Sequence, residues 1–570
     1  MASDTQPPAQ PRAGHTPPRA GAGSRARALR LACLLAALAL QLGHSLPRWD
    51  QPLVDGRLHS VWENARFLLA ARHSNTPPAP DVRSAAPAWL RVFGTARYDY
   101  RPDGSPERLS FYSHHPLLVP ALFRAWTAGF GYAPRAARSF ALVFSLATTL
   151  LLWSYLGRAL RGSSWAGALT LLYALLPLPW QYVDVWKYET PANLVLLAAV
   201  ATLPGAAASA AARLAFLLSL AALGQADWNL YFALPVLLWP LWRRRAEPAS
   251  RRLLRAAAGV ALASLLLNAA LLYALGFDLA RIGEQGGYRI GGGLHGVSGL
   301  ARWAGAQLVY LRTNLGWSGV ALGGLGLVAL LDPQLRRPNR LLHAALCFGL
   351  SGLLWISIFR NLSFIHHFVQ WSFATGLVLL LAGLLRNAGE RWPAPGARVR
   401  GALALLACAL LALAALEAAR LEARTRAAAF GTRGDIAALE TLDCERLWIG
   451  SGGESGPPGW WESPVVRAAF DPIWRGRAGP VCAVRRIEFA RELAAGDLVA
   501  VARADASAAA LRALLRARFP ELRLRERSRS PSFVFLGVAS ALGARQSSPP
   551  GHSGQSRATL PVKRGLRRSR

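Results

Sequence analysis

The chain has 570 residues, a formal net charge of +34 at pH 7 and 53% hydrophobic residues. This apolar content, with a mean hydropathy of +0.24, excludes a soluble protein of several domains. The apolar residues come in blocks long enough to cross a bilayer, about 17–25 residues each. The sequence therefore predicts an all-α polytopic membrane protein.

About eleven apolar blocks predict the membrane spans. Ahead of them, residues 1–27 are rich in Pro, Ala and Arg and predict a disordered cytoplasmic arm. The first block has the basic flank and Ala-rich core of a signal peptide, but we favour an uncleaved signal anchor. Together the blocks predict a transmembrane domain over 28–420 with a large first outer loop over 47–135. The blocks lie near 29–46, 136–159, 163–180, 190–206, 209–224, 229–242, 255–275, 313–332, 341–358, 365–385 and 400–420.

Arginine is concentrated in the N-terminal arm and in every second connection between the predicted spans. A basic excess is also the electrostatic footprint of nucleic-acid binding. Alternation along the chain, however, is what the positive-inside rule predicts for cytoplasmic loops. We therefore predict no nucleic-acid partner, a cytoplasmic N-terminus and an extracytoplasmic C-terminal segment. The basic connections carry Arg158 and Arg161, then Arg243, Arg244, Arg245, Arg251, Arg252 and Arg255, then Arg336, Arg337 and Arg340, then Arg386, Arg391, Arg398 and Arg400.

Two polar stretches interrupt the apolar blocks. The first outer loop holds amphipathic pieces at 58–71 and 116–129, suited to the membrane interface, on either side of a loop rich in Pro, Arg and Tyr. The stretch 276–304 has six glycines between Gly283 and Gly293 and predicts a mobile loop.

The segment 421–540 predicts a small soluble α/β domain on the extracytoplasmic side, followed by a disordered basic tail over 541–570. Cys444 and Cys482 lie in this segment, where an oxidising compartment is compatible with a disulfide. The domain is predicted from β-like runs at 446–450, 498–502 and 533–538 and a helical pattern at 506–518.

Asp55 follows the first span, and Gly56 allows a sharp turn directly after it. A carboxylate just above the membrane could take a proton from an incoming hydroxyl. The competing interpretation is an ordinary helix N-cap, since Asp before a helical run is a common start signal.

His114 and His115 precede Pro116 at the start of an amphipathic run. Two imidazoles there could bind phosphate or a metal, or transfer protons. Alternatively, Pro116 simply begins the helix and the histidines are solvated.

The connection 177–194 combines the acids Asp184 and Glu189 with several aromatic residues. Rings offer apolar faces and carboxylates accept hydroxyl hydrogens, a combination typical of sugar recognition. An aromatic belt with polar caps is the alternative. Glu189, just before Pro191, also suits a first-turn acid favoured by the helix dipole.

Asp227 lies in the next outer loop, and Arg360 and His366 lie in the last one. Arg360 stands out because the outer loops are otherwise poor in arginine, and a guanidinium binds phosphate well. Each of these residues taken singly also fits an ordinary loop position.

Two stretches carry a resemblance to a known family: VDGRLHSVWENARFLL and YSHHPLLVPALFRAWTAGFGYAPRAARSFALVFSLATTLLLW. In their order along the chain, with the Tyr-Glu and Phe-Arg-Asn…His segments that follow, they resemble bacterial glycosyltransferases of the GT-C fold. The resemblance is to family 39 and the protein-mannosyltransferase and aminoarabinose-transferase kind, over about residues 30–385. The chain has His-Pro-Leu where the family usually has His-Pro-Pro-Leu, and His367 stands where members often have an acid.

The resemblance implies roles for individual residues. Asp55 matches the first-loop acid that such enzymes use as a catalytic base, and Glu189 matches the acid after the third span. Asp227 looks like the acid of an Asp-Trp pair seen in some members, and His366 matches a late-loop His near the donor phosphate.

The implied reaction moves a sugar from a polyprenyl-phosphate donor to a hydroxyl of a lipid, glycan or protein acceptor at the outer face of a bacterial inner membrane. His114, His115, Arg360 and His366 would stabilise the leaving phosphate, with Asp184 and Asp227 in the substrate site. No cofactor is implied with certainty. A divalent cation held by Asp55 and Glu189 is compatible with the chemistry but not required.

Three alternatives stay open. A non-catalytic lipid or solute transporter is also polytopic, although transporters keep ionisable groups at the bilayer midplane. A structural membrane subunit would leave the first-loop residues unexplained. A glycan ligase or polymerase is close in chemistry to the preferred reaction.

Overall fold

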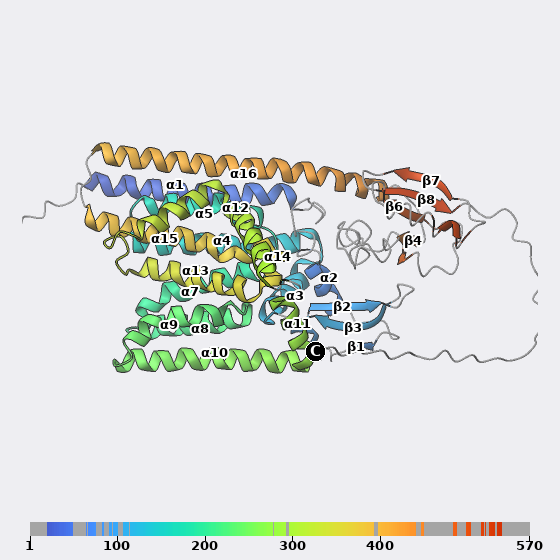
Figure 1. Cartoon of the computed structure of the whole chain (residues 1–570), viewed down its shortest axis with the longest axis horizontal. Helices are drawn as coiled ribbons and strands as arrows, with labels where there is room; N and C mark the ends of the chain where they lie inside the picture. The colour runs from blue at the N-terminus through green and yellow to red at the C-terminus, as the bar shows by residue number, and fades with distance from the viewer. Residues whose placement is uncertain are drawn as a thin grey trace, which may run out of the picture.

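The computed structural model describes most of the chain between residues 20 and 538. Long helices lie side by side in one bundle, and two small sheets lie beyond one of its ends (Figure 1). The predicted fold class, a polytopic helical membrane protein with a small C-terminal α/β domain, is confirmed. The described residues are 20–49, 64, 66–75, 83–84, 90–93, 95–100, 106–112, 115–276, 279–291, 294, 296–392, 397–440, 446–449, 483–486, 498–502, 513, 515–517, 519, 524–529 and 533–538.

Within the described residues, six helices are long and apolar enough to cross a membrane by length and composition. They are α1 (Ala20–Ser45), α4 (Pro134–Ala159), α10 (Pro248–Ala274), α13 (Arg340–Ile358), α15 (Trp371–Arg391) and α16 (Ala397–Glu440). The remaining predicted spans coincide with shorter or interrupted helices, so the protein is a multi-pass membrane protein. These helices are α5 (Trp165–Leu175), α6 (Pro177–Gln181), α7 (Glu189–Ala206), α8 (Ala210–Ala226), α9 (Asn229–Arg243) and α12 (Gly296–Ala329).

Local sequence signals determine where the bundle helices begin. α4 starts at Pro134 after an extended Ala133, and the fixed φ of proline suits the first helical turn. α13 starts after Asn339, whose side-chain oxygen accepts hydrogen bonds from the N–H groups of Leu341 at 2.9 Å and Leu342 at 3.0 Å. This side chain satisfies two of the four N–H groups that a helix start leaves without an intrahelical partner.

α12 is broken at Gly316, which has a φ of 70°. The carboxylate of Glu417 in α16 accepts hydrogen bonds at this break, from the Trp317 N–H at 2.6 Å and the Ser318 hydroxyl at 2.7 Å. A Cβ at position 316 would collide with that carboxylate. Only glycine therefore suits this position, both for its backbone conformation and for its space.

The last helix of the bundle, α16, also contacts the end of the first helix, α1. Glu422 of α16 lies 3.1 Å from His44 Nδ1, measured from its Oε2, and its other oxygen pairs with Arg48. Arg48 belongs to the short 3-10 helix Leu46–Arg48 that follows α1. α16 continues to Glu440, past residue 420, where the sequence predicts the end of the transmembrane domain.

The first outer loop contains more structure than the sequence predicts. Its amphipathic pieces include α2 (Arg66–Asn75) and α3 (Leu118–Phe130), which overlap the predicted ranges. The stretch predicted as a loop contains β1 (Arg83–Ser84), β2 (Thr95–Tyr100) and β3 (Pro106–Tyr112), in the sheet order β1-β3-β2. β2 and β3 pair antiparallel, so the expectation of an irregular loop there is wrong.

The glycine-rich stretch 276–304 is not the predicted loop either. It contains α11 (Leu279–Ile290) and the beginning of α12. Each glycine in a helix interior costs about 1 kcal/mol relative to alanine, but α11 gains a tertiary partner. The Asn361 amide of α14 (Arg360–Ile365) donates to the Tyr288 carbonyl at 3.0 Å.

The C-terminal sheet has the order β5-β4-β6-β8-β7 and is mixed, with parallel pairing around β4 and antiparallel pairing around β8. The runs predicted from the sequence correspond to β4, β6 and β8. Of the predicted helix at 506–518, residues 513 and 515–517 are described and are helical. Cys444 and Cys482 lie outside the described residues. The strands are β4 (Arg446–Ile449), β5 (Ala483–Arg486), β6 (Leu498–Ala502), β7 (Leu524–Arg529) and β8 (Phe533–Val538).

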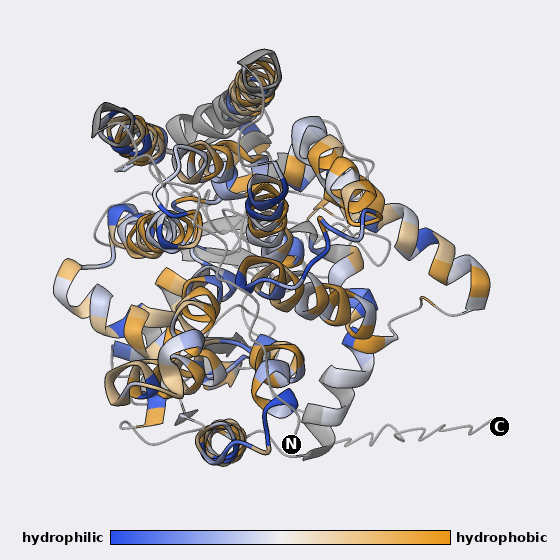
Figure 2. Cartoon of the chain, turned by 90° about the vertical axis from the view of Figure 1, so that its left-hand side faces the viewer, coloured by the Kyte–Doolittle hydropathy of each residue, from blue (hydrophilic) through white to orange (hydrophobic). Residues whose placement is uncertain are grey.

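Hydrophobic residues lie both inside the bundle and on its outer faces (Figure 2). One large apolar cluster joins residues of α4, α5, α7, α8, α9, α13 and α15. Leucines on the outer face of α10, such as Leu262 and Leu266, are exposed, as expected for a helix that contacts lipid. Two smaller clusters form near the sheet end, and Trp228 packs against both.

Candidate functional site

Three of the predicted acids lie among the described residues, and Trp228, the neighbour of Asp227, packs against a cluster that includes Leu109 and Phe111 of β3. Asp184 precedes α7, Glu189 begins α7, and Asp227 connects α8 to α9. Asp55 and His114 lie outside the described residues, so their predicted roles stay predictions. We refer to the end of the bundle that carries the three described acids as the acid-rich end.

His115 and Asp227 form the centre of the described site. His115 Nδ1 lies 3.4 Å from Asp227 Oδ1, an ion pair when the imidazole is protonated. Asp227 is 0% exposed and His115 is 7% exposed. The His115 ring also stacks face to face on the Tyr188 ring, with centroids 3.9 Å apart and planes 14° from parallel. The solvated histidine of the alternative interpretation is therefore wrong for His115.

The carboxylate of Asp227 is held by its own chain neighbours. The Trp228 N–H donates to Oδ1 at 2.7 Å, and the Asn229 side-chain amide donates to Oδ2 at 2.6 Å. Both donors belong to the start of α9. The carboxylate that faces His115 is thus oriented by two hydrogen bonds, as a buried polar group requires.

Glu189 lines a narrow cavity of ≈20 Å³. It is the residue directly after Tyr188, the ring that stacks on His115, and Asn229 lines the same cavity. Glu189 also occupies the first turn of α7, so the predicted stabilisation by the helix dipole is available to it. The other lining residues are Ala192, Asn193, Leu196, Leu223, Phe348, Ser351, Val369, Trp371 and Ser372.

Asp184 is placed differently from the other acids. Its carboxylate lies 3.6 Å from Arg138 Nη1, with both side chains 0% exposed, and accepts a hydrogen bond from the Ser45 hydroxyl at 3.2 Å. Asn64 donates to the Asp184 carbonyl at 3.2 Å and accepts from the Trp186 N–H at 2.6 Å. These contacts join α1, the first outer loop, α4 and the connection before α7, which fits a bracing position.

The aromatic residues of the 177–194 connection are packed inside the protein. Tyr182, Trp186 and Tyr188 are buried, and the Lys187 Nζ lies 3.5 Å from the centroid of the Tyr182 ring. Trp186 packs edge-on against Tyr188, with centroids 4.8 Å apart. Their faces are occupied by neighbouring side chains, so neither an aromatic belt nor an open sugar platform describes these three residues.

Arg360 is the first residue of the short helix α14, and His366 directly follows its last residue. α12 holds this helix through Trp303, whose indole donates to the Ser363 hydroxyl at 2.9 Å, and Tyr310, whose hydroxyl donates to the Phe364 carbonyl at 2.7 Å. Both predicted residues are half-exposed. The segment after His366 leads to Trp371, which lines the same cavity as Glu189.

The described part of the chain contains no group of three or more His, Cys, Asp and Glu residues that could hold a metal ion. Asp55, one of the two residues predicted to hold a cation, lies outside that part. The predicted cation site therefore stays a prediction.

The arrangement brings together groups that can move protons and stabilise charge. A buried imidazole next to an oriented carboxylate can exist in two protonation states, and Glu189 supplies a second carboxylate nearby. Burial strengthens the interaction of such groups with any charge that develops beside them.

Two residues important to the geometry, Arg138 and Asn64, are not predicted as site residues from the sequence. Arg138 has a signal, since an arginine one turn inside an apolar span requires a partner. Asn64 has none, because its function is to bridge two backbone groups of a distant connection.

The chain matches no protein-family model and no curated protein sequence. It is similar to two solved structures of ArnT from Cupriavidus metallidurans, with 14% sequence identity to each. The structure bound to undecaprenyl phosphate matches over 90% of this chain and 99% of that chain, with a TM-score of 0.48. The apo structure matches over 92% and 100%, with a TM-score of 0.47.

Proposed function

We propose that this protein is a membrane glycosyltransferase that moves a sugar from a polyprenyl-phosphate donor to an acceptor hydroxyl at the extracytoplasmic face. The sequence resemblance supports the reaction class. The structural observation that carries the proposal is the buried pair of His115 and Asp227, which come from two separate connections of an apolar helical bundle. The His115 ring also stacks on Tyr188, the residue directly before Glu189.

On this proposal the reaction is a single inverting displacement. Asp55 takes the proton of the acceptor hydroxyl, and the acceptor oxygen forms a bond to the sugar carbon. The bond between that carbon and the phosphate oxygen breaks at the same time, and the polyprenyl phosphate leaves with the electron pair. His114, His115, Arg360 and His366 would stabilise the negative charge on the phosphate. Glu189 would act as a second catalytic carboxylate.

The cavity beside Glu189 restricts how substrates could enter. Its ≈20 Å³ is near the volume needed for one water molecule, far below that of a sugar. Substrate binding therefore requires the lining to move, and the segment between α14 and α15 is short and connects the cavity to the outer end. Such closing and opening is common in enzymes that exclude water from the reacting groups.

The test of this proposal is the variant Asp55→Asn in isolated membranes supplied with a polyprenyl-phosphate sugar. We expect sugar transfer to be abolished while insertion and expression are unchanged, because an amide cannot accept the acceptor proton. The matched control is Asp332→Asn, the same change in the exposed connection at the opposite end of the bundle. Retained transfer in Asp55→Asn would remove Asp55 from the role of base.

We also propose a bacterial inner membrane location, with a cytoplasmic N-terminus and an extracytoplasmic C-terminal domain. The alternation of arginine-rich connections supports this orientation. A reporter that is active only outside the cytoplasm, fused after residue 430, should be active. A silent reporter would contradict the orientation and, with it, the proposed outer location of the acids.

A further inference from the structure

A second cavity, of ≈490 Å³, opens at the end of the bundle opposite the candidate site. Its lining residues come from the end of α4, the start of α13 and the end of α15, together with the connections that follow α4 and precede α13. Five arginines and one glutamate line it, so the cavity carries a strong positive charge. The charged lining residues are Arg158, Arg161, Arg337, Arg340, Arg386 and Glu390. We call this the arginine cavity.

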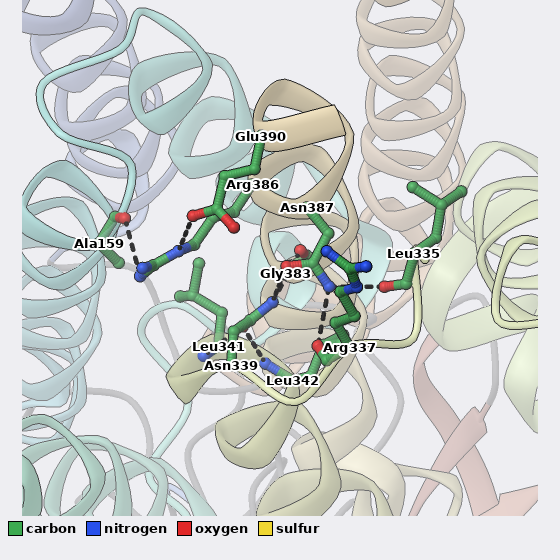
Figure 3. A network of polar contacts seen from close by, with 10 residues as sticks. All are labelled: Ala159, Leu335, Arg337, Asn339, Leu341, Leu342, Gly383, Arg386, Asn387 and Glu390. Atoms are coloured by element: carbon green, nitrogen blue, oxygen red, sulfur yellow. Dashed lines mark hydrogen bonds and ion pairs between the residues drawn. The ribbon is translucent and has the colours of Figure 1, made fainter. Parts of the chain in front are cut away.

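Two asparagines hold the lining of the arginine cavity in shape (Figure 3). The Asn339 amide donates to the Gly383 carbonyl at 3.0 Å and to Asn387 Oδ1 at 2.8 Å, which ties α13 to α15. The Asn387 amide donates to the carbonyls of Leu335 at 2.7 Å and Arg337 at 2.8 Å. The connection that carries Arg337 is therefore fixed by side-chain hydrogen bonds at its base.

Several arginines of the lining are positioned by further contacts. The Arg386 guanidinium lies 3.3 Å from Glu390 Oε1 and 3.5 Å from the Ala159 carbonyl, which links α15 to the end of α4. The carbonyl of Arg340 accepts from the Tyr155 hydroxyl at 3.2 Å. Arg161 has a positive φ of 52°, a conformation that non-glycine residues rarely adopt and that often marks functional segments.

The positive-inside rule explains why this end of the bundle is basic, but not why these arginines line one cavity. Arg243, Arg244 and Arg251 lie at the same end, are exposed, and are not among the lining residues. The cavity is also formed by the ends of three helices that can each cross a membrane, which places it at the depth of the lipid headgroups. Trp392, an interfacial type of residue, lies exposed at the end of the same α15.

We propose that the arginine cavity binds a phosphate group, supplied by the headgroup of an anionic phospholipid. Arginine is well suited to this role, because its planar guanidinium donates paired hydrogen bonds to phosphate oxygens. Basic cavities between membrane helices on the cytoplasmic side bind such headgroups in other proteins. A soluble phosphate ester offers the same chemistry, and the experiment below separates the two sources.

The experiment measures phospholipid binding to the full-length purified protein by native mass spectrometry, with phosphatidylglycerol and with phosphatidylcholine as probes. The test variant carries Arg158→Gln, Arg337→Gln and Arg340→Gln. The matched control carries Arg243→Gln, Arg244→Gln and Arg251→Gln, which removes the same charge from the same end of the bundle. Circular dichroism melting of all three proteins checks folding, and the single variant Arg337→Gln provides a milder change.

We expect the unmodified protein and the control variant to retain phosphatidylglycerol and to prefer it to phosphatidylcholine. The test variant should bind phosphatidylglycerol at least about tenfold more weakly, since each arginine near the surface contributes several-fold to binding. Arg337→Gln alone should show a smaller loss. Equal loss in the test and control variants would show unspecific attraction and overturn the proposal, as would unchanged binding in the test variant.

Inorganic phosphate, added at millimolar concentration, separates the two sources. If the source is a lipid headgroup, phosphate should raise the melting temperature of the delipidated protein little and should not displace phosphatidylglycerol. If phosphate alone stabilises the protein, and does so only while the three cavity arginines are present, the phosphate site stands but the lipid source is wrong. Because no step of sugar transfer is involved, these outcomes are independent of the proposed function.

Discussion

The two ends of the helical bundle hold their charged groups in opposite ways. At the acid-rich end, Asp184, Asp227 and His115 are buried and contact partners from other elements. The cavity that Glu189 lines there measures only ≈20 Å³. At the opposite end, four exposed arginines and the half-buried Arg386 line an open cavity of ≈490 Å³. The same fold therefore holds a buried, oriented cluster at one end and an open, cationic cavity at the other.

The comparison shows that burial, more than charge type, decides what each end can do. Breaking a buried ion pair leaves an uncompensated charge and costs about 3–5 kcal/mol, whereas an exposed pair contributes about 0–1 kcal/mol. The acid-rich end is therefore suited to chemistry that requires fixed groups. The arginine cavity can bind and release an anion with little change in the free energy of unfolding.

The largest expected effect is on sugar transfer and concerns Glu189. The variant Glu189→Gln keeps the size of the side chain and removes its charge. If the carboxylate takes part in catalysis, we expect transfer in membranes to fall by about 10²–10⁴-fold. The control Glu390→Gln, at the arginine cavity, should retain transfer. If Glu189 serves only the helix dipole, transfer persists and stability falls by about 0.3–1 kcal/mol.

The next largest effect concerns the buried pair of Arg138 and Asp184. Arg138→Leu should lower the free energy of unfolding by about 3–5 kcal/mol, because it leaves a buried carboxylate without its cation. The double variant with Asp184→Leu should recover much of this loss. Thermal unfolding in detergent measures both.

The exposed pair of Arg391 and Asp332, 3.0 Å apart, supplies the comparison for that experiment. Arg391→Leu should cost less than about 1 kcal/mol, since the pair is screened by water. Equal losses from Arg138→Leu and Arg391→Leu would contradict the distinction drawn between the two ends.

A smaller effect is expected at the break in α12. Glu417→Ala removes the acceptor of the Trp317 N–H and the Ser318 hydroxyl. By analogy with the loss of a helix cap, we expect a cost of about 1–2 kcal/mol. Glu417→Gln keeps one carbonyl oxygen and should cost less, and an equal cost for both variants would show that charge, not hydrogen bonding, holds the break.

The smallest effect is expected at Arg161 in the arginine cavity. Arg161→Gly relieves the positive φ and should stabilise the protein by up to about 1 kcal/mol. It should also slightly weaken binding of phosphatidylglycerol. Thermal unfolding without added lipid isolates the first effect, and a destabilised variant would show that the arginine side chain contributes more than its backbone costs.

The helices are predictable from the sequence because their signal is local. Each apolar block contains a helix, and Pro134 marks the start of α4 where the hydropathy changes. The sheet in the first outer loop is not predicted from the sequence because its pairing is non-local. β1 pairs with β3, although β2 lies between them in the sequence, and local composition does not reveal such a pairing. α11 escapes because its glycines signal a loop, and its contact with α14 depends on a segment far along the chain.

The candidate site is predictable in its residue types but not in its pairings. The sequence identifies Asp227 and His115 as candidates, yet nothing in their spacing indicates that they face one another. The sequence resemblance distinguishes Glu189, as a catalytic acid, from Asp184 in the substrate site, but it gives no partner for either. The structure distinguishes them, because Asp184 pairs with the buried Arg138 whereas Glu189 lines the small cavity.

The two carboxylates of α16 have a practical consequence for protein engineering. Glu417 holds the break in α12 and Glu422 holds the end of α1, so the last helix closes the bundle at two points. A shortened chain that keeps only the helical bundle must retain residues through Glu422. It must also keep α16 in its present register, since shifting that helix by a single residue would withdraw both carboxylates from their partners.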